Sequence, residues 1–325
     1  MKRKKILVCC ELESHLRDVF SAFERKFDFE YCDYNGKEEI RSIIGGFQGL
    51  VSDIRQCVDR NLIDAAEKLE VIATPSTGTD HIDVDYAESR GIKVQSLKKD
   101  YDFLKTVTAT AEHAFLLMFA SLRNLPSSFD HVKEGGWDRN KFIGRELQGL
   151  KVGIVGYGRL GEIFSRLAMG FDMKIYTCDP FKTVKDPRII QLDYDKLAAT
   201  VDVITIHVHL TDDTRNMFGK REFDMMKDGM CLVNTSLGAL IDETAFLNAL
   251  ISGKVKYAGI DVLATELEGV ISKNPLVQYA RTHDNLIITP HIGGCTFESQ
   301  QKAFKHMLEK LTVFFHPGKE KVRYE

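Results

Sequence analysis

The chain has 325 residues, of which 44% are hydrophobic and 28% are charged, and its formal net charge is −3. This length favours two domains, and the small net charge gives no electrostatic reason to expect nucleic acid or an anionic membrane as a partner. No apolar stretch reaches the ~18 residues that span a bilayer, and no signal peptide is recognisable, so we expect a cytoplasmic protein.

The N-terminal part of the chain alternates between short apolar runs and helical patterns. Apolar residues at helical spacing occupy 15–23 and 60–69. The strand-length runs lie at 5–10, 49–54, 70–80 (which opens into a Gly- and Thr-rich loop) and 91–97. This alternation predicts a parallel sheet that helices cover on both faces.

A long helical pattern follows, from about Val107 to Leu122, with Met and Phe at the spacing of a core face or a subunit interface. A second series of strands and helices begins at Lys151. Its strand-length runs lie at 151–156, 173–179, 202–208, 230–236, 257–263 and 285–291. A last helical stretch, from about 296 to 315, is expected to return to the first domain.

The seven cysteines are scattered along the chain and form no CxxC pair. An odd number without a framework predicts reduced core thiols, with neither disulfides nor a zinc site. His207 and His209 would face the same side of a strand, but no carboxylate or thiol has a matching spacing. We therefore expect no metal site.

The stretch VGIVGYGRLG contains a GxGxxG motif that directly follows an apolar strand and opens a helical pattern. Gly156 would make the tight turn, and Gly158 would let the backbone approach a pyrophosphate. Gly161 would let the helix pack close to the sheet. The N-terminus of the helix adds free N–H groups and a positive dipole end. The alternative is an ordinary tight turn.

Asp179 ends the next strand, at about the 20-residue spacing expected for a carboxylate that binds the adenosine ribose. A carboxylate there repels a 2′-phosphate, so the sequence favours NAD over NADP, although Lys182 nearby keeps NADP open. An ordinary loop carboxylate is the alternative for Asp179.

Hydride transfer between a carbinol and a nicotinamide needs a group that moves the hydroxyl proton. Histidine suits this role because its pKa lies near neutrality, and a neighbouring carboxylate would orient the ring and favour its charged form. His291 and Glu266 each follow a predicted strand, at the edge where open α/β sheets bind ligands. A structural histidine is the alternative.

Over nearly its whole length the chain resembles the D-isomer-specific 2-hydroxyacid dehydrogenases. The resemblance rests on the order and spacing of STGTDHID (76–83), ATAEHAFLLMFASLRN (109–124), GYGRLG (156–161), IHVHLTDDTRNM (206–217), MKDGMCLVNTSLGALIDETAFLNAL (226–250), AGIDVLATE (258–266) and TPHIGG (289–294). It implies an α/β protein with a doubly wound Rossmann-type domain at 105–293 that binds NAD. A smaller flavodoxin-like domain at 1–104 plus 294–325 would bind substrate. The resemblance also implies a cleft between the domains and a homodimer through the helix around Val107–Leu122.

The resemblance implies roles for individual residues. His291 would be the general acid/base with Glu266 as its paired carboxylate, and backbone N–H groups of Thr77 and Gly78 would hold the substrate carboxylate. Asp261 would face the nicotinamide amide, and His113 and His81 would be structural. The residues at the cofactor would be Thr110, Gly156, Gly158, Arg159, Leu160, Gly161, Asp179, His207, Thr235, Ser236, Asp261 and Gly293.

One residue departs from the family at the substrate position. Leu237 stands where the family has an arginine that binds the substrate's carboxylate and 2-oxo group. Leucine offers neither charge nor hydrogen bond, and loss of that charge-assisted contact should cost several kcal/mol in the transition state. Arg55 is a candidate replacement, against the alternative of a solvated surface arginine. His209 also replaces a usual proline.

Three hypotheses follow for function. The first is an NAD-dependent oxidoreductase for a D-2-hydroxy acid, a 2-oxo acid or a related carbonyl compound that is held in a different way. The second is an NAD(H)-binding sensor with little or no turnover. The third is an ordinary but weak dehydrogenase in which the arginine is dispensable.

Overall fold

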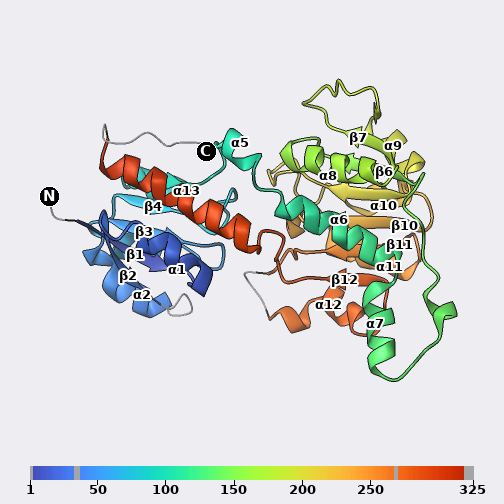
Figure 1. Ribbon diagram of the computed structural model, residues 1–325, viewed down its shortest axis with the longest axis horizontal. Coiled ribbons are helices and arrows are strands. Elements are labelled where there is room, and N and C mark those ends of the chain that lie inside the picture. The colour runs from blue at the N-terminus through green and yellow to red at the C-terminus, as the bar shows by residue number, and fades with distance from the viewer. Residues whose placement is uncertain (1–2, 33–36, 267–269, 318–325) are drawn as a thin grey trace. The chain divides into compact units, whose positions relative to one another are not determined.

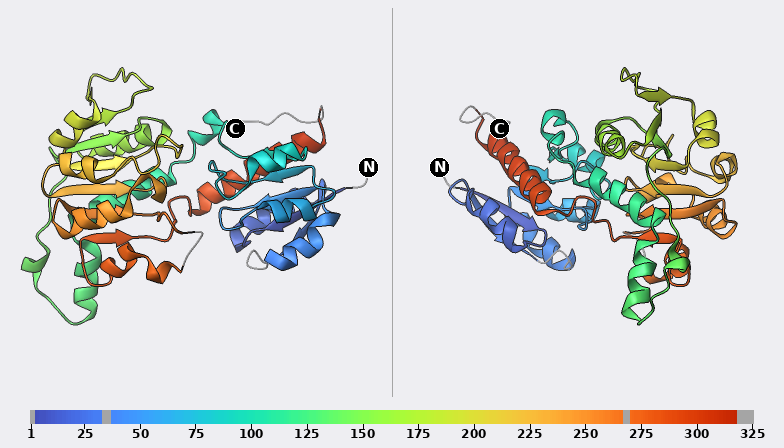
Figure 2. Two further views of the ribbon diagram at one scale, coloured as in Figure 1. Left: turned by 180° about the vertical axis from the view of Figure 1, so that it is seen from behind. Right: turned by 45° about the vertical axis from the view of Figure 1, so that its right-hand side comes forward.

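The computed structural model describes residues 3–32, 37–266 and 270–317. The chain divides into a smaller unit, Met1–Val107 together with Cys295–Glu325, and a larger unit, Thr108–Gly294 (Figure 1, Figure 2). No helix within these described ranges is long and apolar enough to cross a membrane.

The smaller unit is built on a parallel five-stranded sheet with the order β2-β1-β3-β4-β5, which is the flavodoxin-like order. Its strands are β1 (Lys4–Cys9), β2 (Phe27–Tyr31), β3 (Gly49–Ser52), β4 (Val71–Ala73) and β5 (Lys93–Gln95). Along β1, Ile6 and Val8 pack on one face of the sheet, and Leu7 and Cys9 pack on the other. Because both faces are buried, the strand reads as a continuous apolar run.

Helices cover both faces of this sheet. One face carries α1 (Ser14–Ser21) and the C-terminal α13 (Phe297–Phe315). The other face carries α2 (Lys37–Ile43), η1 (Ile44–Gly46), α3 (Arg60–Ala65) and α4 (Val84–Ser89). The short α5 (Tyr101–Leu104) follows β5.

The larger unit contains a parallel seven-stranded sheet with the order β12-β11-β10-β9-β6-β7-β8. Its strands are β6 (Lys151–Val155), β7 (Lys174–Cys178), β8 (Ile189–Gln191), β9 (Val203–Ile206), β10 (Met230–Asn234), β11 (Val255–Ile260) and β12 (Leu286–Ile288). The strand order reverses between β6 and β9, and doubly wound sheets bind ligands beyond the carboxyl ends of the strands at such a switch point. The predicted α/β class with parallel sheets is confirmed.

Two layers of helices enclose the larger sheet. One layer contains α6 (Ala109–Leu122) and α8 (Arg159–Gly170). The other contains α9 (Tyr194–Thr200), α10 (Lys220–Met225), α11 (Glu243–Ile251) and α12 (Pro275–Ala280). The remaining helical segments are α7 (Leu125–Lys133), η2 (Arg139–Phe142), η3 (Gly238–Leu240) and η4 (Ile271–Lys273).

Helix α6 packs directly against β11, because β11 has a glycine where the two elements meet. A Cβ atom added to Gly259 would lie 2.8 Å from the Cβ of Leu117 and 3.2 Å from its carbonyl oxygen, so no side chain fits there. This close approach fixes the position of α6 relative to the carboxyl end of β11.

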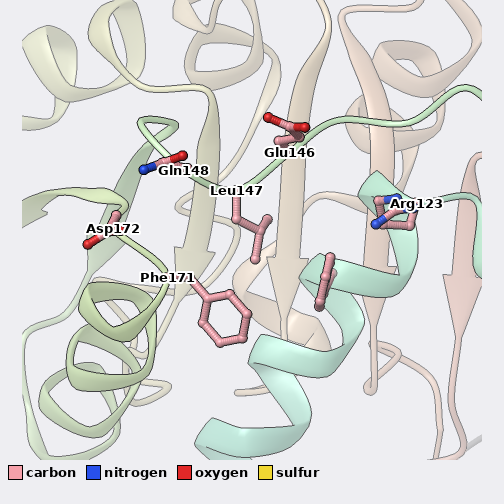
Figure 3. A pocket seen from close by; sticks show the side chains of 7 residues that line it. Arg123, Glu146, Leu147, Gln148, Phe171 and Asp172 are labelled. Atoms are coloured by element: carbon pink, nitrogen blue, oxygen red, sulfur yellow. The ribbon is translucent and has the colours of Figure 1, made fainter.

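The opposite side of α6 is not covered within the described chain. Leu116 is 56% exposed, and Phe171, which follows α8, is 45% exposed. A hollow of about 410 Å³ adjoins this side (Figure 3), and its lining is mixed: Phe119, Leu147 and Phe171 are apolar, whereas Arg123, Glu146, Gln148 and Asp172 are polar or charged. We call Leu116, Phe119 and Phe171 the α6 apolar surface.

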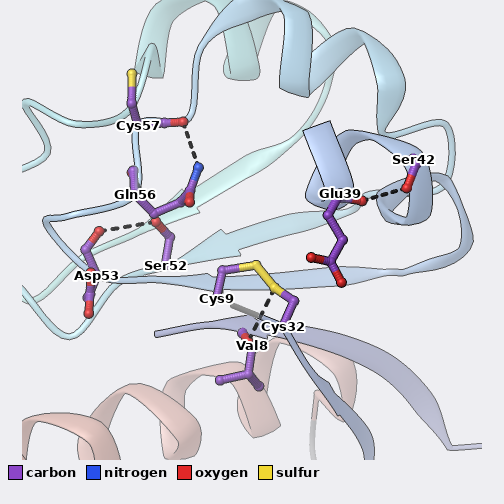
Figure 4. The surroundings of a disulfide bond; sticks show 9 residues. All are labelled: Val8, Cys9, Cys32, Glu39, Ser42, Ser52, Asp53, Gln56 and Cys57. Carbon is purple, nitrogen blue, oxygen red and sulfur yellow. Dashed lines mark hydrogen bonds between the residues drawn. A yellow bond between two sulfur atoms is a disulfide. The ribbon is translucent and has the colours of Figure 1, made fainter. Parts of the chain in front are cut away.

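A disulfide joins Cys9 to Cys32 in the smaller unit (Figure 4), with Cα atoms 5.3 Å apart. The prediction that all cysteines are reduced thiols is therefore wrong for this pair. The parallel register of β1 and β2 pairs Val8 with Tyr31, which places the next residue of each strand side by side. The pairing follows from strand register, so the 23-residue separation carried no signal in the sequence. It also weakens the argument from cysteine usage for a cytoplasmic location.

Candidate active site

The predicted site residues of the larger unit lie at one edge of its sheet. Each follows the carboxyl end of a different strand, because parallel strands all end at the same edge. In chain order they are Gly156 after β6, Asp179 after β7, His207 after β9, Thr235 after β10, Asp261 after β11 and His291 after β12.

His291 and Glu266 form a hydrogen-bonded pair at this edge. The distance from His291 Nδ1 to Glu266 Oε1 is 2.8 Å, and both side chains are partly exposed. A carboxylate can only accept, so Nδ1 carries the proton in this hydrogen bond. Burial lowers the pKa of His291, but the hydrogen bond and charge of Glu266, with the charge of Asp261, outweigh burial, and the net effect raises this pKa.

The backbone of His291 adopts a left-handed conformation, with φ of 55°. For a residue with a Cβ this costs about 1–2 kcal/mol, so the surrounding structure must hold it. The N–H of His291 donates to the carbonyl oxygen of Asp261 at 2.9 Å. The N–H groups of Ile292 and Gly293 donate to the Asp261 carboxylate at 2.9 Å and 2.7 Å. Asp261 therefore holds the turn that carries His291.

Asp261 is buried, with 1% of its surface exposed. Besides the turn, it accepts a hydrogen bond from the hydroxyl of Thr289 at 2.5 Å. Burial raises the pKa of Asp261, but hydrogen bonds from His113, Thr289, Ile292 and Gly293 outweigh it and lower this pKa overall. Its carboxylate thus stays charged, and its role at the nicotinamide amide, which the resemblance implies, stays a prediction.

The glycine-rich loop has the geometry that its motif predicts. Gly156 has φ of 88°, and a Cβ atom there would lie 2.4 Å from the carbonyl oxygen of His207. A Cβ on Gly161 would lie 2.4 Å from the carbonyl oxygen of Gly156, so helix α8 also needs a glycine at its first turn. Gly158 faces open space instead. A phosphate could approach its backbone and the N–H groups of Arg159 and Leu160 at the start of α8.

Asp179 is held beside this loop by two backbone hydrogen bonds. Its Oδ2 accepts from Tyr157 N at 2.8 Å and its Oδ1 from Phe181 N at 2.9 Å. Lys182, the cation that kept NADP open, forms an ion pair with Glu162 of α8. An oriented carboxylate and a neutralised lysine suit a ribose diol better than a 2′-phosphate.

Two buried polar atoms near the loop have no hydrogen-bond partner among the described residues: Thr235 Oγ1 and His207 Nδ1. Burial, and to a smaller extent the charge of Arg159, lowers the pKa of His207 to about 3, so its ring is neutral. Buried polar groups are nearly always satisfied in native proteins, so a bound ligand would be expected to supply partners. The glycine cradle, Asp179 and these two atoms together fit a dinucleotide.

The turn after β10 carries Leu237 and is held by Asn234. Asn234 accepts from Ser236 N at 3.0 Å and donates through Nδ2 to the carbonyl oxygen of Leu237 at 2.9 Å. The hydroxyl of Ser236 donates to Ile206 O at 2.8 Å, so this side chain is engaged within the protein. The Leu237 side chain is half-buried against the apolar core of the unit. It supplies neither a charge nor a hydrogen-bond donor.

Gly238 brings this turn against the segment that leads to Glu266, since a Cβ there would lie 2.1 Å from the carbonyl carbon of Leu263. Glu243 at the start of α11 anchors the same segment: it accepts from Ala264 N at 2.7 Å and from Asn274 Nδ2 at 2.8 Å. Leu237 and Glu266 therefore belong to neighbouring turns at one edge of the sheet.

Thr110 and Gly293 meet at the start of α6. A Cβ on Gly293 would lie 3.3 Å from Thr110 Cγ2 and 3.0 Å from Asp261 Oδ2. Gly293 thus lets the turn after His291 pack against both residues.

The predicted substrate residues Thr77, Gly78 and Arg55 belong to the smaller unit. Among the described residues, the backbone N–H groups of Thr77 and Gly78 have no acceptor. The guanidinium of Arg55 is paired with Asp53 at 2.7 Å and with Glu11 at 3.0 Å. It is therefore a partly neutralised cation and not a free anion-binding group.

Three residues that hold turns at the site were not predicted from the sequence: Asn234, Glu243 and Thr289. A common signal was present: each is polar and lies at the end of a buried strand or the start of a helix, beside a predicted site residue.

The chain is similar to known proteins of one family. The family described as D-isomer specific 2-hydroxyacid dehydrogenase, NAD binding domain, matches residues 115–293. A D-3-phosphoglycerate dehydrogenase of Archaeoglobus fulgidus is 36% identical over 267 residues, which cover 81% of this chain and 49% of the relative. A hydroxypyruvate reductase of Thermotoga maritima is 34% identical over 275 residues, covering 85% of this chain and 87% of the relative.

A solved structure of a glyoxylate reductase from Paecilomyes thermophila has a TM-score of 0.82 and 27% sequence identity, covering 99% of this chain and 98% of that one. The chain spans about half the length of the Archaeoglobus relative, 49%, but most of the Thermotoga one, 87%.

The His291–Glu266 pair generates a prediction that needs no substrate. Glu266→Gln removes the carboxylate charge that raises the pKa of His291, so this pKa should fall. NMR titration of protein with isotope-labelled histidine measures it, and His291→Gln identifies the signal. Glu134→Gln, an exposed change on another segment, is the control. An unchanged His291 titration in Glu266→Gln would contradict the pairing.

Proposed function

The chain belongs to the D-isomer-specific 2-hydroxyacid dehydrogenase family, and on that basis we propose that it is an NAD-dependent oxidoreductase acting on a 2-hydroxy acid, a 2-oxo acid or a related carbonyl compound. The observation that carries the proposal is the His291–Glu266 pair, 2.8 Å apart at the sheet edge that also holds the glycine-rich loop. NAD, when bound, supplies the acceptor or donor of the hydride.

The chain's own part in the reaction is to move a proton. Nε2 of His291 would donate a proton to the carbonyl oxygen during reduction and accept it from the hydroxyl during oxidation. Glu266 stabilises the charged ring and fixes its tautomer through Nδ1. Because the pKa of His291 is raised, its acid form persists to higher pH, which favours reduction there; this capacity is lost as pH rises through that pKa.

Substrate binding would differ from that of the usual family member. We propose that the N–H groups of Thr77 and Gly78 hold the substrate carboxylate, as the resemblance implies. Leu237 would contact an apolar part of the substrate where an arginine would otherwise polarise the carbonyl. Arg55 could bind the substrate only if it broke its ion pairs with Asp53 and Glu11. A bulkier or less acidic carbonyl compound suits such a site better than a minimal 2-oxo acid.

A second candidate function is an NAD(H)-binding sensor with little turnover. Leu237 favours it, since the charge that would stabilise the developing oxyanion is absent from that position.

We also propose a homodimer through the α6 apolar surface. An exposed apolar patch beside a hollow is typical of protein–protein contacts, and a second copy of this chain would cover it. Leu116→Lys should therefore give a monomer by light scattering, whereas Ile251→Lys, a change to an exposed residue at the end of α11, should leave the assembly intact. A monomeric unmodified protein would contradict the proposal.

The two functions separate in one measurement. With NADH and a panel of 2-oxo acids of increasing apolar side-chain length, an oxidoreductase oxidises NADH, and His291→Gln lowers the rate by at least about 100-fold. Tight NADH binding without turnover on the whole panel would favour the sensor.

Leu237→Arg tests the departure from the family. A new guanidinium should raise kcat/KM for glyoxylate and pyruvate by about 10- to 100-fold, since one charge-assisted contact is worth ~1.5–3 kcal/mol. Leu237→Met, which keeps the apolar character, is the control. If Leu237→Arg gives no gain on small 2-oxo acids, other changes in the pocket must exclude them.

A further inference from the structure

We propose that His113 is a positioning residue for the catalytic histidine: through Thr289 and Asp261 it holds the turn that carries His291. This role rests on the proposed function, in which His291 moves the proton. It also gives a task to a histidine that the sequence alone indicated to be structural.

The side chains of three residues contact one another next to the turn that carries His291. His113 Nε2 lies 2.9 Å from Thr289 Oγ1 and 3.4 Å from Asp261 Oδ1, and Thr289 Oγ1 lies 2.5 Å from the same carboxylate oxygen. The carboxylate can only accept, so the hydroxyl proton of Thr289 points to Asp261. The hydroxyl oxygen then accepts from His113, whose Nε2 must carry a proton. The orientation of each group therefore depends on the other two.

Packing between α6 and β11 explains why His113 reaches this carboxylate. Residues two apart on a strand share a face, so Gly259 and Asp261 both face α6, and residues four apart share a helix face, so His113 lies one turn before Leu117. A Cβ atom on Gly259 would lie only 2.8 Å from the Cβ of Leu117, so the glycine lets the two elements approach closely. The close contact at Gly259 thus sets His113, one turn toward the N-terminus of α6, against Asp261, two residues toward the carboxyl end of β11.

Asp261, which contacts His113, in turn holds the backbone around His291. Its carbonyl oxygen accepts from His291 N, and its carboxylate accepts from Ile292 N and Gly293 N. These bonds hold His291 at φ of 55°, a conformation that its own side chain disfavours. If the Asp261 side chain rotates, Ile292 N and Gly293 N lose their acceptors, and the turn no longer holds the His291 imidazole in the same place relative to Glu266.

The charge of Asp261 acts on His291 as well. It contributes to the raised pKa of His291, together with Glu266. The hydrogen bond from His113 in turn helps to lower the pKa of Asp261 and so keeps that charge in place. Glu266 and Asp261 are thus charged groups that act on the pKa of His291, and His113 acts on Asp261. Removal of His113 is therefore expected to disturb both the geometry and the protonation of His291.

The test compares His113→Leu, which removes the donor, with His113→Gln, which keeps an N–H in a similar place. Thr289→Val breaks the group from its other end while keeping the side-chain shape. Glu112→Gln, an exposed neighbour on α6, is the matched control. Each protein is measured for the His291 titration by NMR without cofactor, for NADH affinity by fluorescence, and for kcat and KM.

We expect His113→Leu and Thr289→Val to lower the pKa of His291 and to reduce kcat by about 10- to 100-fold, because small displacements of catalytic groups are costly. NADH affinity should stay within about twofold, and His113→Gln should recover most of both effects. If His113→Leu does not fold, Thr289→Val still decides the question.

An unchanged His291 titration in both His113→Leu and Thr289→Val would overturn the proposal. So would equal losses of kcat in His113→Leu and His113→Gln with the titration unaltered, which would indicate a structural role only. If the unmodified protein shows no turnover, the proposed function fails, whereas the NMR comparison still judges the link from His113 to His291.

Discussion

The Asp261 carboxylate is the constraint on which the turn that carries His291 depends. It is buried at the end of β11, it stays charged, and it binds the backbone of the turn after β12. A buried charge is tolerable only when hydrogen bonds surround it, and here those bonds also set the direction of an imidazole. The hydrogen bonds that the buried Asp261 carboxylate requires thus also determine the orientation of His291.

The interior of the fold could be predicted from the sequence, while two of its edge strands, β2 and β8, could not. Strands buried on both faces, such as β6 and β10, appear as continuous apolar runs, and the glycine-rich loop between β6 and α8 has a recognisable motif. The edge strands β2 and β8 were not predicted, since they are short and largely exposed and so carry no such run. The Cys9–Cys32 disulfide escaped prediction for the same reason, because it depends on how β2 pairs with β1.

The site divides in a similar way. The residue types of His291, Glu266 and Asp179 follow from strand ends and motif spacing. The left-handed backbone of His291 does not, because a histidine gives no sign of a positive φ in a sequence. Nor does the hydrogen bond between His113 and Thr289, which joins residues 176 positions apart and exists only because α6 packs on β11 at Gly259. Local chemistry is visible in the chain, whereas what holds it in place comes from packing.

The two opposite faces of helix α6 have different surroundings. Its inner face carries Leu117 against Gly259, and its outer face exposes Leu116 beside the hollow. An amino-acid exchange on this helix can therefore disturb the turn that carries His291 from the inner face, or the proposed dimer contact from the outer face. A surface helix such as α1 has one buried side and can vary freely on the other. Diversity among descendants of this protein should accordingly gather in the smaller unit and stay low along α6.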